Sequence, residues 1–490
     1  MRFRNTLLLI LVLAGLGAYV FYVERPAVEK EAKKEKLVDF QTDDITEIVL
    51  TYPDREVMLS KAGGSWKVTK PVEADADEAT VKGLLSMLNT AEVKKGLDGE
   101  VKELATYGLE KPNTMIAMKA GDKALPVVKI GEAAPIGGSA YALRGDDKKI
   151  LLTSSSVRSG VEKTLKDLRN KTVFKFSDDN VRKVEVKGEG KDLVLAKSGD
   201  QWKIEAPSAH DADPTAVRSL LSSLRALRAT DFPDEKADLA GYGLDAPKLT
   251  VTLTLTDGAQ QTLLVGGGNE KKEAYVKTAS SPVVYTVGEW VSRDLNKPAD
   301  DFRDKTIVAF DKDKVKAIEV TRKDGSGFTL TRGGDGKWSL EKAEGPQSEA
   351  MLVGYANDLA VLKGYAIAAD GAADLAAFGL EPASARIKVI GPDGAEVGTA
   401  LLGQREVDGK KEYTAARADG NTVFLVRDYQ YTRLDRPASD FGERAAAAAG
   451  APQQVPPGMG AADEMDFDDS GDPGDAGEQP EIEIENVPQE

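Results

Sequence analysis

The chain has 490 residues, of which 30% are charged and 41% hydrophobic, a composition typical of soluble globular domains. Its formal net charge is −16, but residues 445–490 contain 12 acidic residues and no lysine or arginine, so the rest carries only −4. Without a basic excess to neutralise phosphates, nucleic acid is not an expected partner. Cysteine is absent, which excludes disulfides, thiolate metal sites and cysteine nucleophiles.

The first predicted element is an apolar segment, residues 5–23. Its length is sufficient to cross the roughly 30 Å hydrocarbon layer as one helix. Tyr19, Phe21 and Tyr22 lie at its end, where aromatic side chains line the membrane interface. We therefore predict an N-terminal transmembrane anchor over residues 1–24, with membrane contact through residues 5–23.

A cleavable signal peptide is the alternative interpretation, since Arg2 and Arg4 form a short basic start. The residues that follow the apolar segment lack a small-x-small cleavage pattern, which favours the anchor. Basic residues do not decide the orientation, because five of them lie in the charged linker at residues 25–36, interleaved with glutamates. We predict a single-pass protein of the inner (cytoplasmic) membrane with its body in the periplasm or outside.

One sequence pattern then occurs three times with a period of 136 residues. Each copy contains a tryptophan in a β-type segment, at Trp66, Trp202 and Trp338. About forty residues later comes an aromatic-Gly-Leu-acid sequence, here called the turn marker: Tyr107–Glu110, Tyr242–Asp245 and Phe378–Glu381. A period this long corresponds to a whole domain. The predicted organisation is repeat domains at residues 37–170, 171–304 and 305–444, followed by an acidic tail at residues 445–490.

Within a copy, alternating apolar and polar residues predict short half-buried strands, and the tryptophans alternate in phase with them as core residues. A helix is predicted from about Glu78 to Asn89, and a strand of period two over Leu249–Thr256. Lys149–Leu152 is predicted as a closing strand, before an amphipathic stretch that ends at Leu168. The predicted fold class is α+β: three tandem homologous domains, mainly antiparallel sheet with packed helices, after one N-terminal transmembrane helix.

Two acidic loops, Asp75–Asp77 and Asp211–Asp213, resemble metal-binding loops. Both directly precede a predicted helix, where an aspartate caps free backbone amides, so we interpret them as helix caps. The third copy has Gln347-Ser348-Glu349 in this place, a sequence that suits a cap and would bind calcium poorly. The glycines of the turn markers, Gly108, Gly243 and Gly379, are predicted to end a helical turn in the left-handed conformation.

The sequence contains little material for catalysis. His210 is the only histidine, so zinc sites of the HExxH type and centres with several histidines are excluded. Gly266–Gly268 is interpreted as a hairpin turn, and no phosphate-binding loop is present. We assign no catalytic, cofactor-binding or metal-binding residues. A hydrolase that uses two carboxylates stays open as a remote alternative, because any two acids can meet in space.

Two further features point to binding. Tyr141, Tyr275 and Tyr413 stand at matching places in the copies and support an alternative in which the repeats bind an envelope glycan or other polymer multivalently. The tail composition predicts disorder. It is expected to solvate the protein or to tether a basic partner, and Ile482 and Ile484, alternating with glutamates, suit strand addition to a partner's sheet.

An N-terminal anchor followed by repeats with a Trp-Lys-Val/Ile strand, an apolar helix and a Tyr-Gly-Leu-acid turn resembles the bacterial domain-of-unknown-function 4340 (DUF4340) family. The resemblance spans roughly residues 37–443. It implies a membrane-anchored envelope protein, often encoded beside ABC-2-type transporter permeases and auxiliary proteins linked to gliding motility. It supplies no catalytic residues. The predicted function is an extracytoplasmic, non-enzymatic scaffold or accessory protein of an ABC-type transport system, whose permease or auxiliary subunits are the expected partners.

Overall fold

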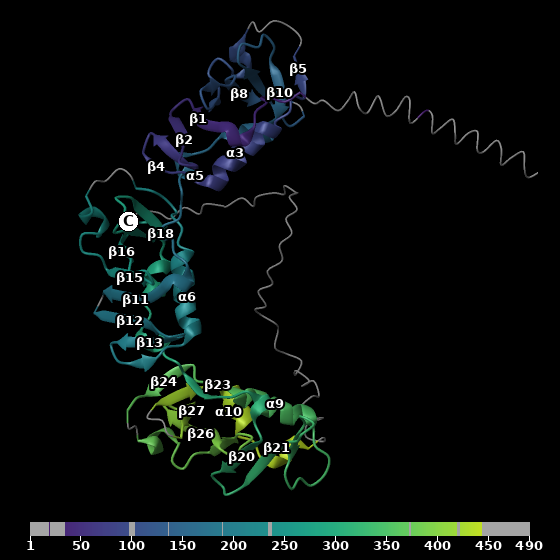
Figure 1. Ribbon diagram of the computed structural model, residues 1–490, viewed down its shortest axis with the longest axis vertical. Helices are drawn as coiled ribbons and strands as arrows, with labels where there is room; N and C mark the ends of the chain where they lie inside the picture. The colour runs from purple at the N-terminus through teal and green to yellow at the C-terminus, as the bar shows by residue number, and fades with distance from the viewer. Residues whose placement is uncertain are drawn as a thin grey trace, which may run out of the picture. The chain divides into compact units, whose positions relative to one another are not determined.

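The computed structural model describes residue 19 and residues 35–97, 103–135, 137–188, 190–233, 238–371, 374–418 and 422–442. Apart from Tyr19, the predicted anchor segment 5–23 lies outside these ranges, as does the acidic tail. In the part of the chain that is described, no helix is long and apolar enough to cross a membrane. The chain divides into two compact units, the first ending at Asp304 and the second beginning at Lys305. Figure 1 traces the elements in chain order.

The first repeat is one antiparallel sheet with a long helix, α3, packed against it (Figure 1). The strand order is β4-β3-β2-β1-β6-β8-β9-β10-β5, and the short β7 pairs with β6. The elements are η2 (Thr42–Asp44), β1 (Ile45–Thr51), β2 (Glu56–Ala62), β3 (Ser65–Lys70), β4 (Ala74–Asp75), α3 (Glu78–Thr90), β5 (Lys95–Gly96), η3 (Leu104–Tyr107), β6 (Thr114–Ala120), β7 (Lys123–Ala124), β8 (Val128–Ala133), β9 (Ser139–Arg144), β10 (Leu151–Ser154), α4 (Ser155–Val161) and α5 (Leu165–Leu168).

The second repeat has the same plan, with an eight-stranded sheet in the order β14-β13-β12-β11-β15-β16-β17-β18. Its elements are η4 (Asp178–Asn180), β11 (Val181–Gly188), β12 (Lys191–Ser198), β13 (Gln201–Ala206), β14 (His210–Asp211), α6 (Pro214–Arg225), η5 (Ala240–Tyr242), β15 (Leu249–Leu255), β16 (Gln260–Gly268), β17 (Glu273–Thr278), β18 (Val284–Gly288), α7 (Trp290–Leu295) and α8 (Ala299–Phe302).

The third repeat has an eight-stranded sheet in the order β22-β21-β20-β25-β26-β27-β28-β24, and a separate pair, β19-β23. Its elements are β19 (Thr306–Ala309), η6 (Lys312–Lys314), β20 (Ala317–Arg322), β21 (Gly327–Arg332), β22 (Trp338–Leu340), α9 (Glu349–Ala360), β23 (Val361–Lys363), β24 (Ala366–Ala369), η7 (Leu375–Phe378), β25 (Ala385–Ile390), β26 (Glu396–Val407), β27 (Lys410–Arg417), β28 (Val423–Val426), α10 (Asp428–Leu434) and η8 (Ala438–Phe441).

These elements confirm the predicted α+β class of repeated, mainly antiparallel domains. The first helix, α3, begins at Glu78 as predicted and ends at Thr90, one residue beyond the predicted end. Its apolar positions recur every three to four residues and are all buried, as expected for an amphipathic helix on a sheet: Val81, Leu84, Leu85 and Leu88. The predicted strand over Leu249–Thr256 is β15, which ends at Leu255.

Two sequence predictions need adjustment. The closing strand predicted at Lys149–Leu152 is β10, which lies two residues later because its apolar residues pair with β9 from Leu151 onward. Trp66 and Trp338 are buried as predicted, whereas Trp202 is only half-buried against its core. Alternation of residue types specifies the face of a strand that a side chain occupies, but not how far neighbouring elements cover it.

In every repeat, the main helix is held at both ends by the two termini of the repeat. The closing segment returns to the residue before the helix, which donates a backbone hydrogen bond to it: Asp77 N to Leu168 O (2.8 Å), Asp213 N to Phe302 O (2.7 Å) and Ser348 N to Phe441 O (2.8 Å). The opening segment pairs with the residues after the helix: Val93 N to Glu35 O (2.7 Å), Ala229 N to Lys171 O (2.7 Å) and Gly364 N to Lys305 O (2.9 Å).

This arrangement leaves no spacer between successive repeats. Asn170 N bonds to Asp75 O of repeat 1 at 2.8 Å, and the next residue, Lys171, is already bonded to repeat 2. Asp304 N bonds in the same way to Asp211 O at 2.8 Å, and Lys305 opens repeat 3. At the start of repeat 1, Arg144 binds Glu35 through an ion pair of 2.7 Å, so the end of the predicted linker is attached to the first sheet.

Candidate functional site

The acidic loops predicted to cap helices do so in repeats 1 and 2. An Asp77 carboxylate oxygen accepts a hydrogen bond from Thr80 N at 2.8 Å, and Asp213 accepts one from Thr215 N at 2.7 Å. Each carboxylate therefore satisfies one of the free amides at a helix start. Across the described residues, no group of three or more His, Asp and Glu side chains is arranged to hold a metal ion.

The third copy departs from this prediction. Ser348 is the N-cap residue of α9, but its side chain makes no capping hydrogen bond. The Gln347 side chain bonds to β22 instead, accepting from Leu340 N at 2.7 Å and donating to Leu340 O at 3.4 Å. The prediction that Gln347-Ser348-Glu349 supplies a side-chain cap is therefore wrong, because the loop residue with the longest polar side chain joins the sheet edge rather than the helix.

The turn markers adopt the predicted geometry. Gly108, Gly243 and Gly379 end short 3-10 turns with φ of 64°, 65° and 68°, in the left-handed region that favours glycine. The leucine that follows each glycine folds back, and its amide donates to the start of the turn: Leu109 to Leu104, Leu244 to Leu239 and Leu380 to Leu375, each at 2.9 Å. All three leucines are buried.

A second glycine faces each turn marker from a neighbouring strand and was missed in the sequence. A Cβ atom added at Gly131 would lie 2.2 Å from Tyr107 O, and one at Gly266 would lie 2.3 Å from Tyr242 O. At Gly403 the nearest atom would be Gly379 O, at 2.5 Å. Gly266–Gly268 is therefore not a hairpin turn, as predicted, but the end of strand β16, where a missing side chain admits the turn backbone.

The matching tyrosines Tyr141, Tyr275 and Tyr413 are half-buried. In repeats 1 and 2 each ring packs against the aromatic ring of the turn marker, with centroid distances of 4.8 Å (Tyr107–Tyr141) and 4.7 Å (Tyr242–Tyr275). In repeat 3 the partner is Tyr431 at 4.7 Å. These contacts occupy one side of every ring, so the tyrosines serve first as packing residues of their repeats.

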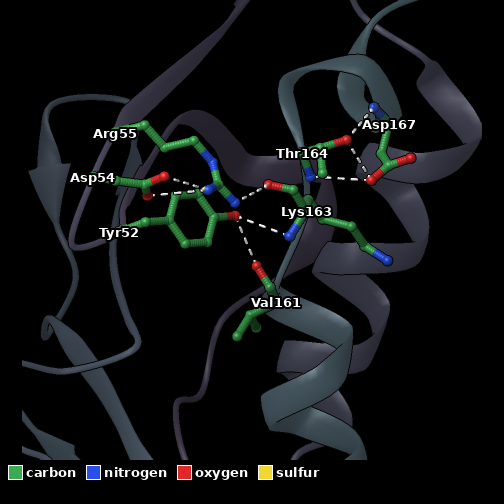
Figure 2. A network of polar contacts seen from close by, with 7 residues as sticks. All are labelled: Tyr52, Asp54, Arg55, Val161, Lys163, Thr164 and Asp167. Atoms are coloured by element: carbon green, nitrogen blue, oxygen red, sulfur yellow. Dashed lines mark hydrogen bonds and ion pairs between the residues drawn. The ribbon is translucent and has the colours of Figure 1, made fainter. Parts of the chain in front are cut away.

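A network of polar contacts in repeat 1 surrounds Tyr52 (Figure 2). Its hydroxyl donates to Val161 O at 2.8 Å and accepts from Lys163 N at 3.0 Å, which joins the end of β1 to the end of α4. The Arg55 guanidinium covers the Tyr52 ring at 4.1 Å. Burial raises the pKa of Tyr52, a shift that the hydrogen bond from Lys163 N partly offsets.

The same network continues into a capping box at the start of α5. Thr164 N and Thr164 Oγ1 both donate to Asp167 Oδ2, at 3.0 and 2.7 Å, and Asp167 N donates to Thr164 Oγ1 at 3.1 Å (Figure 2). Burial raises the pKa of Asp167, but the Thr164 hydrogen bonds together with Lys171 and Lys163 outweigh it, so the pKa lies below the usual value. The network stabilises the closing segment.

Repeat 3 closes with different side chains. Tyr355, in α9, donates to Leu434 O at 3.0 Å, so a tyrosine hydroxyl again bonds to the end of the closing helix. Arg322 forms an ion pair with Asp435 at 3.2 Å, and Tyr431 Oη donates to Asp435 Oδ2 at 2.7 Å. Burial raises the pKa of Tyr431 to about 12. Of these side chains only Asp435 is an acid, whereas glycoside hydrolysis usually requires two carboxylates.

A concave surface of about 780 Å³ in repeat 3 lies between β20, β21 and the loop 341–347. Three glutamates line it: Glu319, Glu341 and Glu344. All three are exposed to solvent. His210, the only histidine of the chain, lies in β14 of repeat 2, in a different compact unit from this surface.

The geometry defines a class of protein built from tandem α+β repeats, in which the residues that recur between repeats stabilise the fold of each repeat. The chain belongs to the family described as Domain of unknown function (DUF4340), which it matches over residues 66–238 and 202–363. The two matches begin at Trp66 and Trp202, the same position of successive repeats, and each extends into the following repeat.

Comparison with curated proteins gave no match. Among solved structures, the chain is similar to a DNA polymerase sliding clamp from Pseudomonas aeruginosa, with 9% identity over 79% of this chain and 92% of the clamp. A second sliding clamp from the same organism, bound to griselimycin, has 10% identity over 80% and 94% of the two chains. The TM-score is 0.12 in both cases, too low to carry any argument about fold or function.

The capping role of Asp77 can be separated from metal binding by a pair of substitutions. Asp77→Ala should lower the free energy of unfolding of repeat 1 by about 1 kcal/mol, because an amide at the start of α3 loses its acceptor. Asp75→Ala, in the same loop with an exposed side chain, should change it by less than about 0.5 kcal/mol. Urea unfolding followed by Trp66 fluorescence, with the other tryptophans replaced, measures both. A rise in stability on adding calcium that either variant abolishes would contradict the capping role.

The close approach at Gly131 predicts a steric effect. Gly131→Ala should destabilise repeat 1 by about 1–3 kcal/mol, because the new methyl group would overlap Tyr107 O and force the turn marker from its strand. Gly83→Ala is the control: this helical glycine has no neighbour within 4 Å of an added Cβ, so alanine should stabilise by about 0.5–1 kcal/mol. The same Trp66 assay applies, and equal effects of the two substitutions would refute the packing of the marker.

The Tyr52 network predicts a pH dependence. Because the folded pKa of Tyr52 lies above the unfolded value of about 10, its stabilisation is complete below pH 10 and is lost as the pH rises through the folded pKa. Tyr52→Phe should cost about 1–3 kcal/mol at pH 7, since Val161 O and Lys163 N lose their partner, and should reduce the loss of stability above pH 10. Urea titrations at pH 7 to 11 test this, and an unchanged alkaline slope would contradict it.

Proposed function

We propose that this protein is a non-enzymatic scaffold of the bacterial envelope, anchored by residues 5–23 and acting as an accessory to an ABC-type export system. The observation that carries the proposal is the use made of the recurrent residues. The capping aspartates, the turn-marker glycines and the residues that join the repeat ends all maintain the repeat itself. Among the described residues the architecture is repeated but no reactive group is repeated with it, which favours a structural role.

The association with transport rests on the resemblance to the DUF4340 family, which implies genes encoded beside those for ABC-2-type permeases. The attachment of Glu35 to Arg144 supports a tethered arrangement, because the segment that follows the apolar residues is held against the first sheet. A binding module for an envelope polymer remains the alternative function. The observation on its side is that Tyr141, Tyr275 and Tyr413 keep part of their rings exposed, although one side of each is packed.

Topology is the first test of this proposal. Alkaline phosphatase fused after Phe441 should be active, because it requires an oxidising compartment, and green fluorescent protein fused at the same place should be dark. The motivation is the basic start, the apolar segment and the large cysteine-free body. A bright fluorescent fusion with an inactive phosphatase would place the repeats in the cytoplasm and refute the extracytoplasmic scaffold.

The second test concerns the partner. The full chain, isolated from membranes in mild detergent after crosslinking, should carry a permease or ATPase subunit of an ABC-type system. Crosslinks to the partner should map to the repeats. The same crosslinks should form with the Asp75→Ala variant, a control substitution that keeps the capping hydrogen bond of α3. Recovery of the protein without either subunit, in membranes where the transporter is present, would contradict the proposed association.

A further inference from the structure

Repeat 3 carries a group of exposed large side chains that the proposed scaffold role does not explain. Val361 is 70% exposed, Tyr365 50% and Tyr429 58%. Together with Arg427 and Arg433 they form a surface that we call the Tyr/Arg patch. Tyrosine and arginine are the residue types enriched at the centres of protein contacts, where they contribute much of the binding energy.

The members of the patch lie on adjoining elements. The Arg427 guanidinium carbon is 4.8 Å from the Tyr365 ring centroid, and that of Arg433 is 5.7 Å from the Tyr429 ring. Two further contacts join the elements: Gln430 Nε2 in α10 donates to Lys363 O in β23 at 3.1 Å, and Arg433 Nη1 donates to an Asp358 oxygen in α9 at 3.3 Å. The rings are therefore held in place with their outer faces free.

The residue at the place of Tyr365 differs in the other repeats. Tyr365 N bonds to the last long strand of its repeat at Leu425 O, and the equivalent bonds are Lys94 N to Leu152 O and Thr230 N to Thr286 O. Lysine and threonine thus occupy the place of Tyr365. In repeat 1 the region is a hollow of about 180 Å³, lined by Thr90, Lys94, Ser154 and Ser156 among others. In repeat 2 the corresponding helix α7 exposes Trp290 and Arg293, so what is particular to repeat 3 is the second aromatic side chain, Tyr365, beneath Arg427.

We propose that the Tyr/Arg patch is the docking site for the acidic tail of the same chain, centred on Asp463–Asp469. This sequence, Asp-Glu-Met-Asp-Phe-Asp-Asp, combines five carboxylates with two large apolar side chains. Guanidinium groups bind carboxylates through paired hydrogen bonds. The Tyr365 and Tyr429 rings and Val361 offer the apolar surface that suits Met465 and Phe467. Arg427 is the cation that faces the tail carboxylates, because Arg433 is already paired with Asp358 at 3.3 Å.

The tail can reach the patch within one molecule. Gly442 forms a bridge with Gln347, next to the start of α9, and the patch lies at the far end of this helix. A helix of 12 residues is about 18 Å long. Twenty residues separate Gly442 from Asp463, and a chain of that length spans about 25 Å without being extended. An intramolecular contact of this kind has an effective concentration in the millimolar range.

The test uses a fluorescent peptide of residues 459–473 and two proteins, the full chain and the chain ended after Arg444. The shortened chain should bind the peptide saturably in a fluorescence polarisation titration, because its patch is vacated. The full chain should bind at least about tenfold more weakly, because its own tail competes. Equal binding by both proteins would show that the tail does not occupy the patch, and would overturn the proposal.

Variants locate the contact. Tyr365→Ser combined with Tyr429→Ser in the shortened chain should weaken peptide binding at least about tenfold. Arg427→Glu should also weaken it at least about tenfold, and the loss of affinity should be larger at low salt than at high salt, because salt screens the charges. Both tyrosines are exposed, so the fold is expected to survive, which the unfolding midpoint checks. Arg182→Glu, a charge reversal at an exposed arginine of repeat 2, is the matched control and should leave binding unchanged.

Two further results would refute the proposal. A scrambled peptide of the same composition that binds as well as the native sequence would reduce the contact to unspecific charge attraction. Dimers of the full chain that disappear when the tail is removed would show that the tail docks on a second copy instead. The outcome does not depend on the proposed association with a transporter.

Discussion

The fold of each repeat depends on one backbone constraint, the return of the closing segment to the residue before the main helix. The amides of Asp77, Asp213 and Ser348 each donate to a carbonyl that lies about ninety residues later in the chain. This hydrogen bond places the exit of the repeat at the start of its helix. The opening segment is bonded beyond the other end of the same helix, so the sheet, the helix and both termini form one closed unit. Repeats built this way can follow one another without a spacer.

Side chains vary around this constant backbone. The closing helix of repeat 1 is bonded by Tyr52 from the end of β1, and that of repeat 3 by Tyr355 from within α9. Repeat 3 adds the Arg322–Asp435 ion pair. Buried pairs of this kind gain little net stability, because the desolvation of both charges offsets their attraction. The copies therefore preserve main-chain geometry while the side chains that join the closing segment differ.

Local signals made much of the fold predictable from the sequence. The helix over Glu78–Thr90, the left-handed glycines of the markers and the aspartate caps all follow from neighbouring residues. Contacts between residues far apart in the sequence were not predictable. Nothing in the residues around Gly131 indicates that Tyr107 O lies against it, and Gly266 was predicted as part of a turn because its contact with Tyr242 O could not be foreseen. The Tyr/Arg patch was also not predicted, because the sequence does not show which side chains of the helix α10 and of the residues before β24 remain uncovered.

Amide hydrogen exchange at the residue before each helix tests the closure of the repeats most directly. If the closing bond is part of the cooperative core, the amides of Asp77, Asp213 and Ser348 should exchange as slowly as those of the central strands β1, β11 and β20. The three residues lie in loops, so a loop without this bond would exchange orders of magnitude faster. Exchange at the rate of the exposed turn at Gly63 and Gly64 would contradict the account, because the repeats would then be open at the junction that joins one to the next.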